Sequence, residues 1–475
     1  MIGTVMSFTS FDNRHPVVCV QGLGFVGMAM AIAVADAKNE NGKPYYNVIG
    51  VDLPNEMGLE KINSVNDGKL PLVTNDPDLL DAFNRVVKQG NLKATSDPEV
   101  YSQASIVVVD IHLDVIELED GTHTASFGGF RKALQTVGSK VKPGTLILVE
   151  TTVPPGTCEK VVVPELKAAM KARGHDEDSL LIAHSYERVM PGKNYYNSIV
   201  NFWRVYSGNC EKAADSAEAF LSNVINVDDY PLTRLHSTTA SETAKVLENS
   251  YRAANIALIQ EWGSFAEAVG VDLFQVLDAV KIRPTHNNIR FPGFGVGGYC
   301  LTKDPHFVDI GARELFGIDD LSFPFCKQAV AANKQMPLTA LAKAKKQLGG
   351  DLGDKTILLL GVSYLQDVGD TRYSPSEDFV RAAEEDGAKV ISHDPLLNHW
   401  EELNRDVHQD MPALDGVDIV VFAVQHAEYL TIDLNDWSNG NNVAFLDAHN
   451  VLTQQQIYDA AKHNLDIQFI GKGVK

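Results

Sequence analysis

The sequence predicts an α/β protein with two doubly wound parallel sheets and a long helix between them. Apolar, strand-like runs alternate with helical or polar segments in the N-terminal part of the chain, and again after about residue 354. Between these regions, residues from about 236 to 269 follow the three-and-four spacing of one helix. The chain has 475 residues, 44% hydrophobic and 22% charged, which is long enough for two or three domains with cores of their own.

The first predicted strand leads into a glycine-rich turn that is typical of dinucleotide binding. An apolar run at 17–20 is followed by GLGFVG, starting at Gly22, and by a predicted helix at 28–37. The glycines let the backbone approach a pyrophosphate, and the helix N-terminus offers N–H groups to it. A second strand at 48–51 ends at Asp52, which can accept hydrogen bonds from a ribose diol and would repel the extra phosphate of NADP. We therefore expect NAD, bound by Gly22, Gly24, Phe25, Val26, Gly27 and Asp52.

Three further strands of the first sheet are predicted at 106–109, 145–149 and 180–183. The loop 150–157 follows the second of them, at the sheet edge where open α/β folds bind ligands. Thr152 in this loop can offer a hydroxyl to cofactor or substrate, or it can cap the next helix. Glu187 and Arg188 follow the third strand beside a Pro-Gly turn, where their position favours a ligand loop over a surface ion pair.

The long central helix is expected to carry two functional side chains. Thr238 or Thr239 is a candidate cap, and a buried stripe is predicted from Ala240, Ala244, Leu247, Tyr251, Ala254 and Leu258. Lys245 and Asn249 lie four residues apart on the flank of this stripe, so they point in one direction. An ammonium beside an amide can stabilise an oxyanion, whereas a lysine on such a helix is more often a solvated charge. A helix of this length also suggests an interdomain spine and a dimer interface.

A cysteine loop follows the helix and contains the strongest chemical signal in the chain. Residues 297–304 read GGYCLTKD, which places Lys303 and Asp304 close behind the thiol of Cys300. A thiolate attacks aldehyde carbons readily, a nearby cation favours the thiolate, and a nearby carboxylate can transfer protons. The competing interpretation is a buried cysteine that acts as a small hydrophobe in a tight turn.

The second α/β region is predicted to have strands at 356–360, 389–393, 418–424 and 443–446. It lacks a full GxGxxG pattern, so it should bind a different nucleotide or none. Arg372 in the loop 369–376 can grip a phosphate and Ser376 can cap the next helix, although a surface loop with a stray arginine is the alternative. A local positive pocket for a diphosphate is expected from Arg283, Arg290, Lys303 and Arg372.

Composition limits the partners and the location. The formal net charge of -21 argues against nucleic acid and against an anionic membrane surface. The five cysteines are odd in number and contain no CxxC pair, which predicts reduced thiols and no metal site. The stretch before His15 lacks the pattern of a leader, and no run of about 18 apolar residues occurs. We expect a soluble, cytoplasmic protein.

In order along the chain, these motifs resemble the UDP-glucose/GDP-mannose dehydrogenase family, which oxidises nucleotide sugars to uronic acids with NAD. The resemblance covers nearly the whole chain and rests on the Lys245/Asn249 helix and on GLGFVG at Gly22, TTVPPGT at Thr151, ERVMPG at Glu187, GGYCLTKD at Gly297 and GDTRYSPS at Gly369. It implies two Rossmann-like domains joined by the long helix and a small helical dimerisation domain. The expected boundaries are 1–232 for NAD binding, 233–335 for the central part with the cysteine loop, and 336–475 for nucleotide-sugar binding.

The resemblance also implies a role for each candidate residue. Lys245 would hold the sugar and stabilise oxyanions with the support of Asn249, while Thr152, Glu187 and an ordered water take part in proton transfer. Cys300 would add to the C6 aldehyde, and Asp304 would help water to hydrolyse the resulting thioester after a second hydride transfer. Substrate contacts would come from Glu187, Arg188, Lys245, Asn249, Phe291, Gly297, Lys303 and Arg372.

The identity of the sugar is left open by a mixed pattern. Tyr186-Glu187-Arg188-Val189 resembles the branch that acts on UDP-N-acetylhexosamines, whereas Tyr299 and Lys303-Asp304 resemble the UDP-glucose type. Neither Arg283 nor Arg290 matches the arginine with which UDP-glucose enzymes reach a neighbouring subunit. The resemblance implies a homodimer or higher oligomer and a role in polysaccharide biosynthesis. Two alternatives are a two-electron hydroxy-acid dehydrogenase of the 6-phosphogluconate type and an inactive nucleotide-sensing protein.

Overall fold

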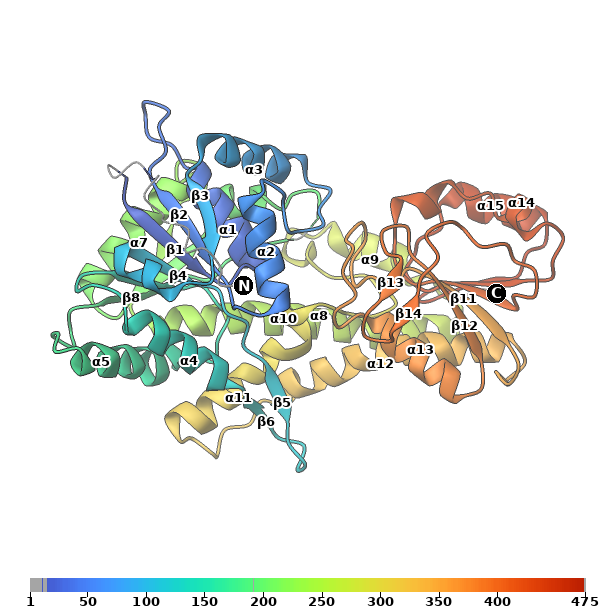
Figure 1. Cartoon of the computed structure of the whole chain (residues 1–475). Helices are drawn as coiled ribbons and strands as arrows, with labels where there is room; N and C mark the ends of the chain where they lie inside the picture. Colours follow the sequence, from blue (N-terminus) through green and yellow to red (C-terminus); the bar gives the residue numbers. More distant parts are fainter. Residues whose placement is uncertain (1–10, 12–14, 191, 474–475) are drawn as a thin grey trace. The chain divides into compact units, whose positions relative to one another are not determined.

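The computed structural model describes Phe11, residues 15–190 and residues 192–473 (Figure 1). Most of the stretch before His15, Pro191 of the Pro-Gly turn, and the last two residues lie outside the described part of the chain. The chain divides into two compact units, Met1–Val246 with Phe307–Ser322 and Leu247–His306 with Phe323–Lys475. The expected three-part division at residues 232 and 335 stays a prediction.

The first unit is built on a doubly wound sheet, as the strand pattern predicts. Within its described residues, the strand order is β10-β9-β8-β7-β4-β1-β2-β3, and all neighbours are parallel except β8 and β9. The order reverses between β1 and β4, which makes this the switch point where such sheets bind ligands. The strands are β1 (Val17–Gln21), β2 (Asn47–Val51), β3 (Leu92–Thr95), β4 (Ala104–Val109), β7 (Leu146–Val149), β8 (Leu181–His184), β9 (Val205–Gly208) and β10 (Thr233–Arg234).

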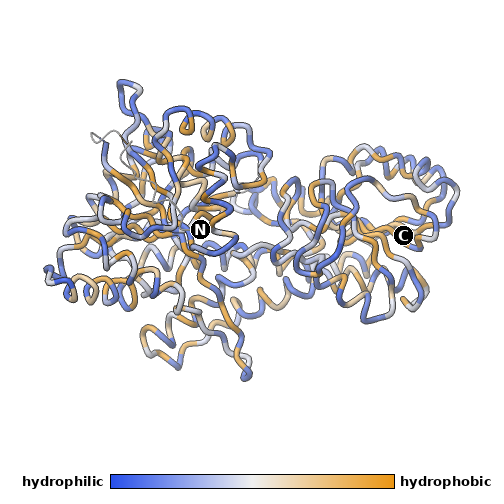
Figure 2. The backbone as a smooth tube through the Cα atoms, viewed as in Figure 1, coloured by the Kyte–Doolittle hydropathy of each residue, from blue (hydrophilic) through white to orange (hydrophobic). Residues whose placement is uncertain are grey.

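Helices cover both faces of this sheet and account for its apolar strands. Buried side chains of α1 (Phe25–Asp36), α3 (Pro77–Gln89) and α7 (Glu211–Val224) form one core, and those of α4 (Phe127–Gly138) and α5 (Val163–Ala172) belong to the other. Strands buried on both faces are expected to be continuous Val, Ile and Leu runs, and the strand segments are correspondingly orange in Figure 2. The first helix begins three residues earlier than predicted, because Gly24 already occupies the N-cap position.

The second unit contains a smaller parallel sheet with the order β12-β11-β15-β16-β17 among its described residues. Its strands are β11 (Thr356–Leu360), β12 (Lys389–His393), β15 (Ile419–Phe422), β16 (Ala444–Asp447) and β17 (Ile467–Phe469). One face packs against α12 (Pro324–Gln347) and α13 (Pro375–Glu385), and the other against α14 (Leu434–Ser438) and α15 (Gln454–Lys462). The four predicted strands are confirmed to within two residues. The short strand β17 was not predicted.

Shorter elements complete the described chain. In the first unit they include α2 (Glu56–Asn66), the hairpin β5 (Val115–Glu117) and β6 (His123–Ala125), α6 (Asn197–Val200) and α11 (Phe307–Ile310). In the second they include α9 (Leu273–Lys281), α10 (Tyr299–Lys303), β13 (His399–Trp400) and β14 (Arg405–Asp406). No helix in the described ranges combines the length and the apolarity that crossing a bilayer requires.

The long helix α8 (Thr238–Val269) is present, but its predicted buried stripe is wrong. Leu247, Tyr251 and Leu258 are 65%, 52% and 51% exposed. The buried face instead carries polar side chains, among them Glu242, Lys245 and Asn249. The periodicity of Leu, Tyr and Ala identifies one face of the helix, but it does not show whether that face is buried. The predicted cap is also wrong, because Ser237 accepts the N–H of Ala240 through its hydroxyl.

Glu242 anchors the start of the helical turn that follows the 150–157 loop. Its two carboxyl oxygens accept the backbone N–H groups of Gly156 at 2.6 Å and Cys158 at 2.7 Å. Burial raises the pKa of Glu242 to about 7, while these hydrogen bonds oppose the shift. The carboxyl group therefore satisfies two N–H groups that would otherwise be buried without partners.

We predict that Glu242→Ala lowers the free energy of unfolding by about 2–4 kcal/mol, because two buried donors lose their acceptor. The matched control is Thr243→Ala, on the exposed side of the same helix turn. Denaturant unfolding measures both changes. Equal stability of the two variants would contradict the anchoring role.

Candidate active site

The glycine-rich loop at the switch point has the geometry of a dinucleotide cradle. A Cβ on Gly22, whose φ is 97°, would lie 2.3 Å from the carbonyl oxygen of Asp110, and one on Gly27 would lie 1.9 Å from that of Gly22. These two positions require glycine for the turn and for close packing. A Cβ on Gly24 would meet nothing within 4 Å, so open space lies beside the first residue of the helix cap. This space and the helix N-terminus fit a pyrophosphate.

Asp52 lies at the end of β2, where a ribose would be recognised. Its Oδ2 accepts the N–H of Leu23 at 3.0 Å and its Oδ1 accepts the N–H of Leu53 at 2.7 Å. The ammonium of Lys61 is 3.6 Å from Oδ2. A carboxylate has about four acceptor positions, so it can still accept hydrogen bonds from a diol. The residues present therefore fit an NAD molecule, which the chain would hold through this loop and Asp52.

The 150–157 loop is fastened by Thr151 rather than by Thr152. The hydroxyl of Thr151 lies 2.9 Å from the carbonyl oxygen of Ile111 and 3.1 Å from that of Val109. The following helical turn begins at Cys158 with Thr157 in the N-cap position. The alternative in which Thr152 caps this helix is therefore wrong.

Glu187 and Lys245 form a buried pair in the first unit. Lys245 Nζ donates to the backbone carbonyl of Glu187 at 2.7 Å and lies 3.5 Å from its Oε1. Glu187 Oε2 accepts the N–H of Val189, and the Lys245 ammonium is 5.4 Å from the centre of the Tyr186 ring. Both residues are less than a tenth exposed. Lys245 is thus no solvated charge, and the alternative of a surface ion pair with Arg188 is wrong.

In the second unit, Cys300 stands exposed next to a fixed carboxylate. Asp304 is 1% exposed and accepts a hydrogen bond from Asn249 Nδ2 at 2.7 Å. Its other oxygen is 3.1 Å from Lys303 Nζ. Cys300 lies one turn earlier in α10 and is exposed, which contradicts the interpretation of a buried structural cysteine. The arrangement combines an accessible thiol with a carboxylate whose orientation is set from two sides.

Arg252 is a site residue that the sequence reasoning missed. Partial burial and the positive charge of Arg290 lower the pKa of Arg252, and interaction with Cys300 opposes the shift. A guanidinium therefore lies within electrostatic range of the thiol. The available signal was its position on α8, three residues after Asn249 and so on nearly the same face.

The cysteine loop packs against the 369–376 loop of the same unit. A Cβ on Gly297 would lie 2.6 Å from the carbonyl oxygen of Tyr373, so only glycine fits there. Arg372 forms a two-point ion pair with Asp370 at 2.7 and 2.8 Å and donates to the hydroxyl of Tyr299 at 3.1 Å. The Asp370 carboxylate and Tyr299 raise the pKa of Arg372 despite the opposing effect of its burial. Arg372 is thus held in place by partners, not stray in a surface loop.

The predicted helix cap in this loop is also wrong. Ser374, rather than Ser376, occupies the N-cap of α13 and accepts the N–H of Ser376. The hydroxyl of Ser376 instead donates to the carbonyl of Gly361. Both serines fit the pattern of a cap, and only the position of Pro375 at the first helical residue decides between them.

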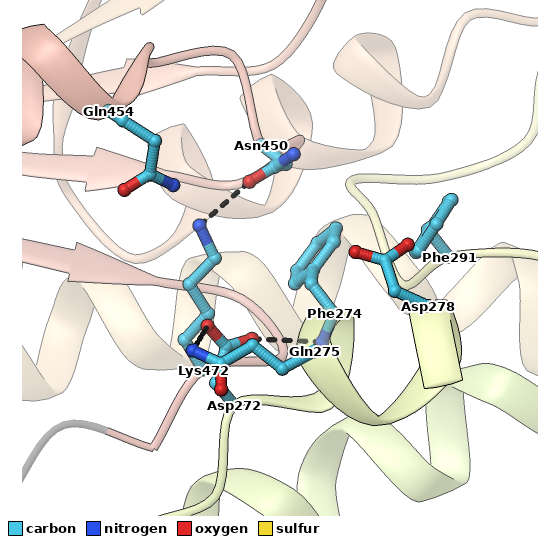
Figure 3. Close-up of a pocket in the computed structure, with 8 residues that line it drawn as sticks. All are labelled: Asp272, Phe274, Gln275, Asp278, Phe291, Asn450, Gln454 and Lys472. Carbon is cyan, nitrogen blue, oxygen red and sulfur yellow. Dashed lines mark hydrogen bonds between the residues drawn. The ribbon is translucent and has the colours of Figure 1, made fainter. Parts of the chain in front are cut away.

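A pocket of about 250 Å³ opens in the second unit around Phe274 and Phe291. These two rings stack with their centres 5.4 Å apart, and Lys281 and Lys472 lie over their faces. Figure 3 shows Lys472 pointing toward Asn450. Phe291 belongs to the predicted substrate residues, whereas Cys300 and Asp304 do not line this pocket.

The predicted site residues therefore form two groups. The first unit holds the glycine loop, Asp52, Thr152, Glu187, Arg188 and Lys245. The second holds Asn249, Phe291, Gly297, Cys300, Lys303, Asp304 and Arg372. Lys245 and Asn249 belong to different groups although they lie on consecutive turns of α8.

Three family models of one family match consecutive parts of the chain. The NAD binding domain of the UDP-glucose/GDP-mannose dehydrogenase family matches residues 17–223, its central domain residues 239–335, and its UDP binding domain residues 358–454. A UDP-N-acetyl-D-mannosamine dehydrogenase from Methanocaldococcus jannaschii is 28% identical over 442 residues, which is 92% of this chain and 93% of the relative.

Solved structures resemble the chain over almost its full length. The structure of a UDP-D-ManNAc dehydrogenase from Pyrococcus horikoshii has a TM-score of 0.80 and 26% identity, with 96% of this chain and 99% of that chain covered. An NDP-N-acetyl-D-galactosaminuronic acid dehydrogenase from Methanosarcina mazei has a TM-score of 0.76 and 26% identity, with 97% and 96% covered.

We predict that Asn249→Asp destabilises the second unit. The change places a second carboxylate about where the amide now donates to Asp304, so one of the two carboxyls must bind a proton. We expect a loss of about 1–3 kcal/mol at a pH of about 8, and a smaller loss at a pH of about 5, where that proton is bound more easily. Thermal unfolding at both values measures the effect.

The control for this prediction is Thr243→Asp, which adds the same charge at an exposed position of the same helix. We expect little change for it at either pH. A pH-independent loss in Asn249→Asp would show that the amide acts through packing alone.

Proposed function

The chain belongs to the UDP-glucose/GDP-mannose dehydrogenase family and is an NAD-dependent nucleotide-sugar dehydrogenase, and from this premise we propose a four-electron reaction. It converts the C6 hydroxyl of the sugar to a carboxylate through a thiohemiacetal and a thioester on Cys300. The observation that carries the proposal is an exposed thiol beside the buried Asp304, which Asn249 and Lys303 orient. A simple two-electron alcohol dehydrogenase needs no such thiol.

In the first oxidation, Lys245 holds the sugar and stabilises the alkoxide that forms when the C6 hydroxyl loses its proton. The proposal is supported by its fixed position on the backbone of Glu187 and by its burial, which strengthens electrostatic effects. Glu187 and Thr152, with a water molecule, accept and pass on that proton. NAD, when bound, would accept the hydride from C6.

In the second oxidation, the Cys300 thiolate adds to the aldehyde carbon and forms the thiohemiacetal. Asn249 and Lys245 stabilise the oxyanion on that carbon until its hydride leaves, for which a second NAD molecule would be the acceptor. The thioester then reacts with water, which Asp304 activates by accepting a proton, and the acid and the free thiol are released. The guanidinium of Arg252 supports the role of Cys300 as the nucleophile, because a nearby cation favours a thiolate.

The nucleotide diphosphate of the substrate binds to the C-terminal region. We assign this role to Arg372, Lys303, Phe291 and Gly297. The match of the UDP binding domain to residues 358–454 and the packing of the cysteine loop against the Arg372 loop support it.

We propose a UDP-N-acetylhexosamine as the substrate, with UDP-N-acetylmannosamine as the first candidate. Two of the relatives with near-complete coverage are UDP-N-acetyl-D-mannosamine dehydrogenases by name, and Glu187-Arg188-Val189 resembles that branch. UDP-glucose is the second candidate, because Tyr299 and Lys303-Asp304 resemble the UDP-glucose type.

We also propose that the enzyme acts in the cytoplasm as a homodimer or higher oligomer and supplies uronic acids for polysaccharide biosynthesis. Support for the oligomer comes from an exposed apolar stripe on α8, formed by Leu247, Tyr251, Leu258, Trp262 and Phe265. Large apolar side chains on one helix face are costly in water and typical of interfaces.

We predict two NADH per molecule of acid formed. The assay incubates the enzyme with NAD and, separately, with UDP-N-acetylmannosamine, UDP-N-acetylglucosamine, UDP-glucose and GDP-mannose, and quantifies both products. UDP-N-acetylmannosamine should have the highest kcat/KM. A ratio of one would indicate a two-electron dehydrogenase, and no NADH with any sugar would indicate a nucleotide-sensing protein.

A further inference from the structure

A group of buried and half-buried charged side chains lies at the switch point of the first sheet, behind the glycine loop. Asp110 follows β4, and a Cβ on Gly27 would lie 3.1 Å from its Cβ. Glu150 follows β7, and Arg204 directly precedes β9. The charge of Glu187 acts on both Asp110 and Glu150. Spacing along the sequence gives no hint of this group, because each residue comes from a different strand end.

Within this group, two buried carboxyl oxygens receive no hydrogen bond from the described residues. Arg204 forms an ion pair with Glu150 Oε1, and the two side chains are 3% and 0% exposed. Asp110 Oδ2 and Glu150 Oε2 are both buried and accept no hydrogen bond from a donor in the described residues. A buried carboxylate oxygen without a donor is costly. A proton shared between the two carboxyl groups satisfies both oxygens at once.

Charge balance identifies the residue that carries this proton. Glu150 is paired with Arg204, and Glu187 is paired with Lys245. A charged Asp110 would add a third carboxylate with no cation of its own. Burial, the charge of Glu150 and the hydrogen bond to it raise the pKa of Asp110 well above its ordinary value; the charge of Glu187 adds to this shift, and Arg204 opposes it. His184 adds no charge, since burial and Lys245 lower its pKa to about 3.

We propose that Asp110 keeps its proton in the working enzyme and acts as a neutral positioning residue, which donates a hydrogen bond to Glu150 and leaves the cofactor crevice without an extra negative charge. Its backbone carbonyl lies against Gly22 of the dinucleotide loop. A carboxylate at this place would repel the diphosphate of NAD and disturb the balance that holds Glu187 and Lys245. The inference requires the NAD site alone and is independent of the four-electron chemistry.

The inference has a definite sign in a pH titration. The folded chain retains the Asp110 proton at pH values where the unfolded chain has released it. Stability therefore falls as the pH rises from the ordinary carboxyl range toward the raised pKa of Asp110. Asp110→Asn has the same shape, donates the same hydrogen bond through its amide, and cannot ionise. It should lack this part of the pH dependence.

The test compares thermal unfolding of the wild type and Asp110→Asn from a pH of about 5.5 to about 8.5. We expect the Tm difference to grow in favour of the variant as the pH rises toward the raised pKa of Asp110, because below that pKa its folding constant gains up to about tenfold per pH unit relative to the wild type. The control Glu119→Gln, at an exposed position, should follow the wild type. A constant difference between Asp110→Asn and the wild type would overturn the proposal.

Two further measurements keep the proposal open to refutation. Calorimetric titration with NAD at neutral pH should give an affinity of Asp110→Asn within about threefold of the wild type, and a loss above about tenfold would show that a carboxylate is required. In Glu150→Gln, Asp110 should ionise to pair with Arg204, so this variant should also lose the wild-type pH slope. A full slope in Glu150→Gln would contradict the assigned proton.

Discussion

The buried polar face of α8 is the constraint on which the site depends. Glu242, Lys245 and Asn249 occupy successive turns of one helix face, and each binds a different loop of its own unit. Polar groups are buried at low cost only where their partners are well placed. The helix therefore fixes the 150–157 loop, the Glu187 loop and Asp304 beside the cysteine. Within each unit, the helix thus fixes residues that lie far from it in the sequence.

Pairing of charges, more than their number, determines the electrostatics of this acidic chain. Lys303 and Arg372 are both paired with carboxylates, so the positive pocket expected from counting cations is weaker than the sequence suggests. Paired cations are, however, well oriented, which matters for a bidentate grip on a diphosphate. In the first unit, Arg204 is paired with Glu150 and Lys245 with Glu187. Because no cation is left to pair with Asp110 in this group, we propose that Asp110 is neutral at the cofactor crevice.

The sequence predicts those parts of the molecule that local patterns determine. Apolar runs such as 48–51 and 356–360 identify strands, and GLGFVG identifies the cofactor loop, because the glycines are required by the turn itself. The prediction of a helix cap fails where two candidate residues lie close together, as with Ser374 and Ser376. The exposed face of α8, Arg252 and the Asp110 group could not be predicted, since burial and charge pairing arise only when distant segments pack together.

The central claim is that Cys300 carries the sugar as a thioester before hydrolysis. Mass spectrometry of Asp304→Asn, incubated with NAD and UDP-N-acetylmannosamine, tests it most directly, because loss of the general base should let the thioester accumulate. We predict an adduct on the peptide that contains Cys300, with the mass of the peptide plus the substrate minus four hydrogens. The adduct should persist when Cys326→Ser is added to Asp304→Asn, and it should disappear when Cys300→Ser is added. If Cys300→Ser instead forms acid at the wild-type rate and Asp304→Asn shows no adduct, the account is contradicted.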